Sequence, residues 1–154
     1  MKTMKTMARE SDKAEILRRL KTIRADSPRK WGRMSAHQMI CHLSDSLLAV
    51  TGQRPASAAS GPLQRTVVKW VALYAPLKWP HGVPTRPEVD QEVGGTRPAA
   101  FATDITQLEM LVELVTTRKG CFGPTHPIFG PMSDTDWMRW AYLHMDHHLR
   151  QFGC

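Results

Sequence analysis

Histidine is the side chain with the widest chemical range here, because its ring titrates near neutral pH and its neutral form is a common metal ligand. The chain has seven histidines, and three of them, His144, His147 and His148, lie close together near its carboxyl end. On an α-helix, His144 and His148 lie one turn and about 40° apart, on the same side as Trp137 and Ala141. Two imidazoles on one apolar face can direct their ring nitrogens to a single divalent cation.

A third ligand has to come from another segment if the cation is to keep an open position. An earlier predicted helix offers His37 and His42. His42 lies beside the apolar face of that helix, whereas His37 projects roughly 140° away. We therefore predict that His42, His144 and His148 bind one metal ion. His147, about 80° from the centre of its apolar face, is predicted to lie at the edge of the site or at the surface.

The competing interpretation is that these histidines are ordinary core or surface residues, since a pair spaced by four can arise by chance. Leaving polar side chains unpaired in a core costs roughly 1–3 kcal/mol each, and a bound cation removes that cost.

Other catalytic patterns are missing from the sequence. It has neither the His-Glu-x-x-His of zinc proteases nor the Glu-x-x-His of di-iron bundles, and neither a glycine-rich phosphate loop nor a nucleophile elbow.

Hydrophobic periodicity and capping signals place the site histidines on helices. Ser35 with Gln38, and Ser133 with Asp136, form capping boxes before the two histidine-bearing segments. The segments predicted to be helical are residues 11–24, 36–51, 62–75, 103–119 and 134–152. Two long loops are predicted at residues 76–98 and 120–132. The first loop holds five prolines, and both are expected to form the walls or lid of the site. No segment alternates like a strand, so the predicted fold class is all-α, a helix bundle with one short additional helix.

Composition limits the class of protein. A chain of 154 residues, 42% of them hydrophobic, is long enough for one domain, predicted at residues 11–154 after a flexible segment at residues 1–10. We expect no membrane span and no secretory signal. The three cysteines have no Cys-x-x-Cys spacing, which favours a reducing cytoplasm. The net charge of +7 is scattered along the chain, so nucleic acid is not an expected partner.

Three sequence blocks resemble the DinB-like metalloenzyme superfamily, in a branch of unassigned function. They are WGRMSAHQM at residues 31–39, leading to His42; HPIFG at residues 126–130; and HMDHHLRQFG at residues 144–153. The resemblance implies an up-down-down-up four-helix bundle, often dimeric, that holds one divalent ion on three histidines. Mapped onto this sequence, those histidines are His42, His144 and His148, the set predicted above. Relatives of this kind include hydrolases, and transferases and isomerases that use low-molecular-weight bacterial thiols.

The first functional hypothesis is a metal-dependent transferase or hydrolase that acts on a small molecule. Zinc is the first choice of ion, with nickel, iron and manganese as alternatives, because imidazole suits all of them. A water or a thiolate would bind the open position as nucleophile, and a low-molecular-weight thiol is a candidate cofactor. Arg65 and Lys69 are candidate charge partners for an anionic substrate, although both can be ordinary surface charges. A homodimer is expected from the resemblance.

The second hypothesis is a non-catalytic, metal-binding stress or interaction protein with a structural ion. Such an ion needs a fourth protein ligand, which His126, His147 or a cysteine would have to supply. Cys41 points about 100° away from His42 and is expected to be a packed thiol. The ring nitrogens that do not bind the ion need hydrogen-bond partners, and the sequence leaves these open. The candidates for this role are Gln38, Tyr142 and Gln151, whereas Asp45 and Asp146 are poorly placed on the helical wheel.

Overall fold

The computed structural model describes residues 3–154, in which five α-helices account for most of the regular structure. The helices are α1 (Glu10–Leu20), α2 (Ala36–Val50), α3 (Lys69–Tyr74), α4 (Phe101–Thr117) and α5 (Asp134–Gln151). A π-helical segment, η1 (Gln64–Val68), precedes α3, and a 3-10 turn, η2 (Pro87–Val89), lies in the proline-rich loop. The predicted helical character is confirmed. The all-α prediction missed a small antiparallel sheet of β1 (Thr125–His126) and β2 (Gly130–Pro131), whose two-residue strands are too short to show alternation.

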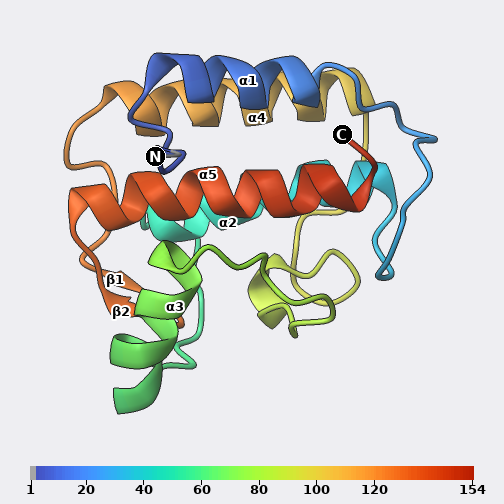
Figure 1. Cartoon of the computed structure of the whole chain (residues 1–154). Coiled ribbons are helices and arrows are strands. Elements are labelled where there is room, and N and C mark those ends of the chain that lie inside the picture. The colour runs from blue at the N-terminus through green and yellow to red at the C-terminus, as the bar shows by residue number, and fades with distance from the viewer. Residues whose placement is uncertain (1–2) are drawn as a thin grey trace.

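Four long helices lie in two layers. Figure 1 shows α1 beside α4 and α5 beside α2, with α1 and α5 running in one direction and α2 and α4 in the other. α2 packs against α4, and α1 packs against α5. The fully buried apolar side chains of this core include Ile16, Leu20, Met39, Ile40, Leu43, Leu108, Val112 and Leu149. No helix in residues 3–154 has both the length and the apolar character needed to cross a membrane.

The two histidine-bearing helices begin where the capping boxes predicted. At α2, the Ser35 hydroxyl accepts the Gln38 amide at 3.1 Å, and the Gln38 side chain accepts the Ser35 amide at 2.9 Å. At α5, Ser133 and Asp136 make the same reciprocal pair. Each box satisfies two backbone donors that the first turn leaves free, so it fixes the residue at which the helix starts. The register of the histidines on both helices follows from these starts.

Residues 5–7 of the amino-terminal segment contact the helices. Residues 1 and 2, part of the segment predicted to be flexible, lie outside the described residues. Met7 is buried, and its amide donates to the Met138 carbonyl at 3.1 Å. Lys5 forms ion pairs with Asp12 and Glu15 of α1. Helix α1 ends at Leu20, four residues before the predicted end.

The segment formed by η1 and α3 projects from the helical body (Figure 1). The sequence predicted a helix with an apolar stripe there, and a helix forms. Several of its apolar side chains are nevertheless exposed: Leu63 is 59%, Val67 57% and Trp70 61% exposed. Only Leu73 of α3 is buried. Periodicity identified the amphipathic helix but could not tell whether the rest of the chain covers its apolar side.

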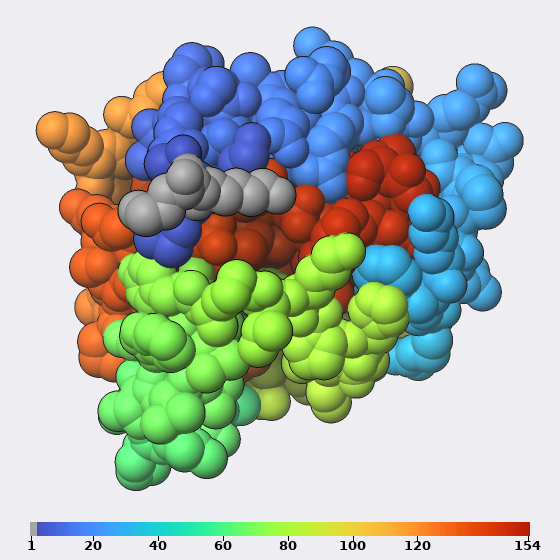
Figure 2. Space-filling view, in the orientation of Figure 1, coloured from blue at the N-terminus to red at the C-terminus, as the bar shows by residue number. Residues whose placement is uncertain are grey.

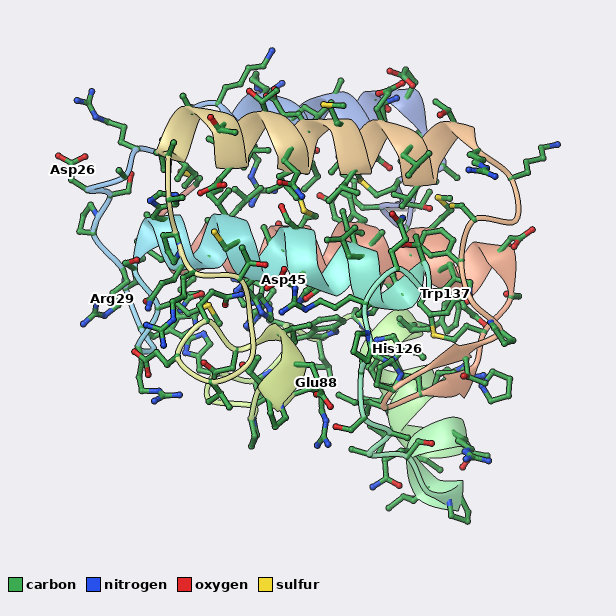
Figure 3. All side chains as sticks on the ribbon, turned by 180° about the vertical axis from the view of Figure 1, so that it is seen from behind. Asp26, Arg29, Asp45, Glu88, His126 and Trp137 are labelled. Atoms are coloured by element: carbon green, nitrogen blue, oxygen red, sulfur yellow. The ribbon has the colours of Figure 1, made fainter. Side chains whose placement is uncertain are left out.

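The proline-rich loop, residues 76–98, is fastened to α2 by one buried carboxylate. Asp45 accepts hydrogen bonds from the Gln91 side chain at 2.8 Å and from the Thr96 amide and hydroxyl at 2.7 Å each. Arg54 adds an ion pair at 3.2 Å. In Figure 3, Asp45 lies between α2 and this loop. These contacts hold the loop over the face of α2 that carries His42.

Candidate metal centre

Three histidine rings meet between α2 and α5. One nitrogen from each of His42, His144 and His148 lies within 4.8 Å of the others, and no fourth histidine, cysteine or acidic side chain in residues 3–154 joins this group. The His42 ring centroid lies 5.2 Å from that of His144 and 4.7 Å from that of His148. The two α5 rings lie 4.9 Å apart. We call this set the three-histidine group.

The spacing of the nitrogens suits a shared cation. The Nε2 atoms of His42 and His144 lie 3.3 Å apart. Two nitrogens bound at about 2.0–2.1 Å to one tetrahedral ion are about 3.3–3.4 Å apart, which matches this separation. The residues present therefore fit a divalent ion, and the group can hold one.

The orientation of the His42 ring is fixed by the proline-rich loop. Its Nδ1–H donates to the Val89 carbonyl of η2 at 2.8 Å. With the proton on Nδ1, the neutral ring presents the lone pair of Nε2 to the centre of the group. Val89 was missed by the sequence analysis, because a backbone carbonyl in an irregular loop carries no signal in residue type or spacing.

The orientation of the His148 ring is fixed by Gln151, one of the three candidates named from the sequence. Nδ1–H of His148 donates to Gln151 Oε1 at 3.0 Å. The amide of Gln151 is itself oriented, because its Nε2 donates to the Trp31 carbonyl at 2.9 Å. Gly32, with φ of +79°, leaves room for that amide, since a Cβ atom there would lie 2.6 Å from it. Both ring partners leave Nε2 free, as is common for metal-binding histidines.

Burial keeps the rings of the group neutral. It lowers the pKa of His42, and it lowers the pKa of His144 and His148 well below the usual value, with further lowering from the neighbouring imidazoles. Neutral imidazole is the form that binds metals. The ring of His144 also stacks on Trp140, with centroids 5.0 Å apart and planes 19° apart. The arrangement is thus a set of neutral nitrogen donors against an apolar wall.

The three-histidine group opens into a cavity of about 820 Å³. The proline-rich loop and residues 126–129 form two of its walls, as the sequence predicted for the two long loops. Its apolar lining includes Trp31, Val67, Val71, Leu77, Trp79, Val83 and Trp140. Figure 2 shows the green and yellow-green segments that contain α3 and the proline-rich loop lying over the orange-red α5.

The two histidines considered as a fourth ligand, His126 and His147, lie outside the three-histidine group. His126 is buried beside Trp137 (Figure 3), and its Nδ1 accepts the amides of Ile128 and Phe129 at 3.1 and 3.2 Å. It therefore holds the turn between β1 and β2 and does not join the three-histidine group. His147 lines the cavity but also stays outside the group, and burial lowers its pKa to about 4.

Two expected charge partners of a substrate are also placed away from the cavity lining. Arg65 lies across Gly130 and donates to the Ser60 hydroxyl, and Lys69 donates to the Pro131 carbonyl. The cations that do line the cavity are Arg33, Lys78 and Arg86. Spacing on the projecting helix identified positive charges but not the direction in which they point.

Two of the three side chains that the sequence offered as hydrogen-bond partners for the ligand rings make other contacts. The side chain of Gln38 caps α2, and the hydroxyl of Tyr142 donates to Glu15 at 3.2 Å. Asp146 pairs with Arg19 and Arg150, away from the group. Of the three candidates, Gln151 alone makes a hydrogen bond to a ring of the three-histidine group.

The sequence matches the family described as "Protein of unknown function (DUF1569)" over residues 4–153, and the chain belongs to that family. No curated protein and no solved structure matches it significantly.

The contact between Gln151 and His148 leads to a first prediction. Replacing Gln151 with alanine removes the acceptor that orients the His148 ring, so we expect zinc affinity to fall by about 10–100-fold. The matched control is Gln107→Ala, which removes an exposed amide on α4 and is expected to leave affinity unchanged. Competition titration of both variants against a chromogenic zinc chelator measures the effect. Equal affinity in the two variants would contradict the assigned role of Gln151.

Proposed function

We propose that this protein is a metal-dependent enzyme of the transferase or hydrolase type, acting on a small molecule held in the cavity beside the three-histidine group. The observation that carries the proposal is the open side of the group. Three neutral imidazoles face one point, and that point borders a cavity of about 820 Å³. Cavities of this size are typical of small-molecule sites. A structural ion is normally closed by four protein ligands, and the group in residues 3–154 has three.

His42, His144 and His148 would hold a divalent ion, with zinc as the first choice. Such an ion supplies Lewis acidity and lowers the pKa of a water or thiol that reaches its open position. The protein contributes the rest: Val89 and Gln151 orient two of the rings, and Trp140 with Trp79 limits access of bulk water to the group. These contacts keep the donors in place before substrate arrives.

The cavity lining favours a substrate with an apolar body. Aromatic and aliphatic side chains dominate the walls, and the charged side chains that line the cavity are Arg33, Lys78, Arg86, Asp90 and Glu92. Arg33 forms ion pairs with both acids, at 3.5 and 3.0 Å. An anionic group on the substrate would find Lys78 and Arg86 among the cavity-lining cations.

We also propose that the family shares the DinB-like four-helix bundle. The directions of α1, α2, α4 and α5 in Figure 1 support this relationship, as does the position of the three histidines on α2 and α5. The thiol-dependent chemistry of DinB-like relatives makes a low-molecular-weight thiol the first co-substrate to test.

Two measurements test the proposal: whether an added ligand can bind the metal ion, and whether the protein turns over a substrate. Cobalt(II) replaces zinc as a visible probe, and azide or a small thiol is then added. We expect the visible spectrum to change on addition, because an open position accepts the added ligand. Zinc-loaded protein is then assayed with electrophilic small molecules, with thiols for transfer and without them for hydrolysis. A cobalt spectrum insensitive to every added ligand would contradict the enzyme and support the alternative, a non-catalytic protein with a structural ion.

A homodimer is the proposed assembly, and the projecting η1–α3 segment supports it. Leu63 and Trp70 are exposed apolar side chains there, outside the cavity lining, of the kind that marks contact surfaces. We expect sedimentation velocity to give a dimer, and Trp70→Glu to shift it to monomer without loss of helical circular dichroism. The control is Val93→Glu, which changes an exposed residue of the proline-rich loop. A monomeric wild type would contradict this assembly.

A further inference from the structure

A second group of metal-ligand side chains lies on another face of α2. His37 and Cys41 of α2 and Asp104 of α4 each place one donor atom within 4.8 Å of the others. His37 and Cys41 are four residues apart, so they lie one turn apart on one side of the helix. That side is turned by about 100–140° from His42. Helix α2 therefore faces the α5 histidines on one side and Asp104 on the other.

The three side chains converge on one carboxylate oxygen. Nε2 of His37 lies 2.6 Å from Asp104 Oδ2, and the Cys41 thiol donates to the same oxygen at 3.7 Å. The Ala99 amide also donates to it, at 3.2 Å, and so fixes the carboxylate at the start of α4. The side chains of His37 and Asp104 are each 16% exposed, so a cation can reach the group from solvent. Cys41 closes the group on the inner side, where it is buried.

A catalytic cysteine is a poor explanation of this group. In a nucleophilic pair the imidazole contacts the sulfur, whereas the His37 ring contacts Asp104. Burial and the nearby carboxylate also raise the pKa of Cys41 to about 12, the reverse of what activates a thiol.

We propose that His37, Cys41 and Asp104 form a second divalent-metal site, suited to zinc or another borderline-soft ion. Nitrogen, thiolate sulfur and carboxylate oxygen are the three donor types that zinc takes from proteins, and a helical pair four residues apart can supply two of them. On binding, the Cys41 thiol proton leaves to solvent and Nε2 of His37 gives up the proton that faces Asp104, so each ligand presents a lone pair. The ion would join the first turns of α2 and α4.

The two sites differ in donor chemistry, and cobalt(II) tells them apart. The three-histidine group has only nitrogen donors, whereas the second site has one sulfur. Cobalt bound to a thiolate adds a near-ultraviolet charge-transfer absorption that imidazole ligands do not give. We expect the wild-type protein to show this band on titration with cobalt chloride under reducing conditions. Cys41→Ser should remove the band, and Asp104→Asn should weaken cobalt binding at the second site by about tenfold or more.

Two controls make the result specific. Cys121→Ser removes a partly exposed thiol outside both groups and should keep the band. His148→Gln weakens the three-histidine group and should also keep it. Absence of the band from folded wild-type protein, or its survival in Cys41→Ser, overturns the second site. The visible cobalt absorption of Cys41→Ser reports the three-histidine group separately. If His148→Gln leaves that absorption unchanged in the Cys41→Ser protein, the proposed function fails while the second site stands.

Discussion

Replacing His148 with alanine is expected to reduce metal affinity at the three-histidine group by at least about 100-fold, or about 2.8 kcal/mol. The side chain supplies one of only three donors, and its removal also leaves Gln151 Oε1 without the Nδ1–H donor. After dialysis against metal-free buffer, the bound ion should be lost. Elemental analysis of protein purified without a metal column or a histidine tag measures the loss.

This measurement is best made in the Cys41→Ser protein, so that the proposed second site does not contribute to the metal count. The matched control is His81→Ala. The His81 ring stacks on Trp31 with centroids 3.8 Å apart but does not belong to either donor group. We expect His81→Ala to retain the ion. Unchanged metal content after His148→Ala would show that the ion, if any, binds elsewhere.

The stability of the metal-free protein is expected to fall steeply as the pH drops below about 6.5. Burial lowers the pKa of His126 to about 3 and of His147 to about 4, it lowers the pKa of His42, and it holds the pKa of His144 and His148 well below the usual value of 6.5. The unfolded chain therefore binds more protons than the folded chain below pH 6.5, so acid favours unfolding. Stability is fully present above that pH and is lost as the pH falls from 6.5 toward the folded-state values.

The size of the effect follows from the number of groups. Each such histidine costs up to about 1.4 kcal/mol per pH unit once its unfolded form is protonated, so five cost up to about 7 kcal/mol per unit. A domain is typically stable by about 5–15 kcal/mol, so one to two pH units should bring the protein near unfolding. Urea unfolding in EDTA between pH 7.5 and 5 measures this slope.

A matched variant tests whether the buried rings cause the slope. His148→Gln replaces one ring with a side chain that does not titrate, and it should reduce the slope by about one fifth. Unfolding free energy that stays constant from pH 7.5 to 5 would contradict neutral, buried histidines in the folded state.

Local signals in the sequence were enough to predict where the two histidine-bearing helices begin. The capping boxes at Ser35 and Ser133 involve only neighbouring residues, and the structure contains both. Helical periodicity then placed His144 and His148 on one side of α5 and separated His42 from His37. The structure brings His42 to the α5 pair, as that pattern predicted.

These local signals could not predict contacts between segments that are far apart in the sequence. The carbonyl of Val89 orients His42, and Asp45 fastens the loop that carries it, but neither role has a periodic pattern. The contact of His37 and Cys41 with Asp104 depends on how α2 and α4 pack. The helical wheel predicted the direction in which His37 and Cys41 point, but it could not identify the residue that they contact. The same limit explains Trp70, whose apolar side chain is exposed because no other segment in residues 3–154 covers it.

The most direct test of the three-histidine group is X-ray absorption at the zinc edge, on Cys41→Ser protein loaded with one equivalent of zinc. We predict a first shell of light atoms with the scattering pattern of three imidazoles, at about 2.0–2.1 Å, and a position left for an added ligand. A shell containing sulfur, or one with fewer than two imidazoles, would contradict a centre formed by His42, His144 and His148.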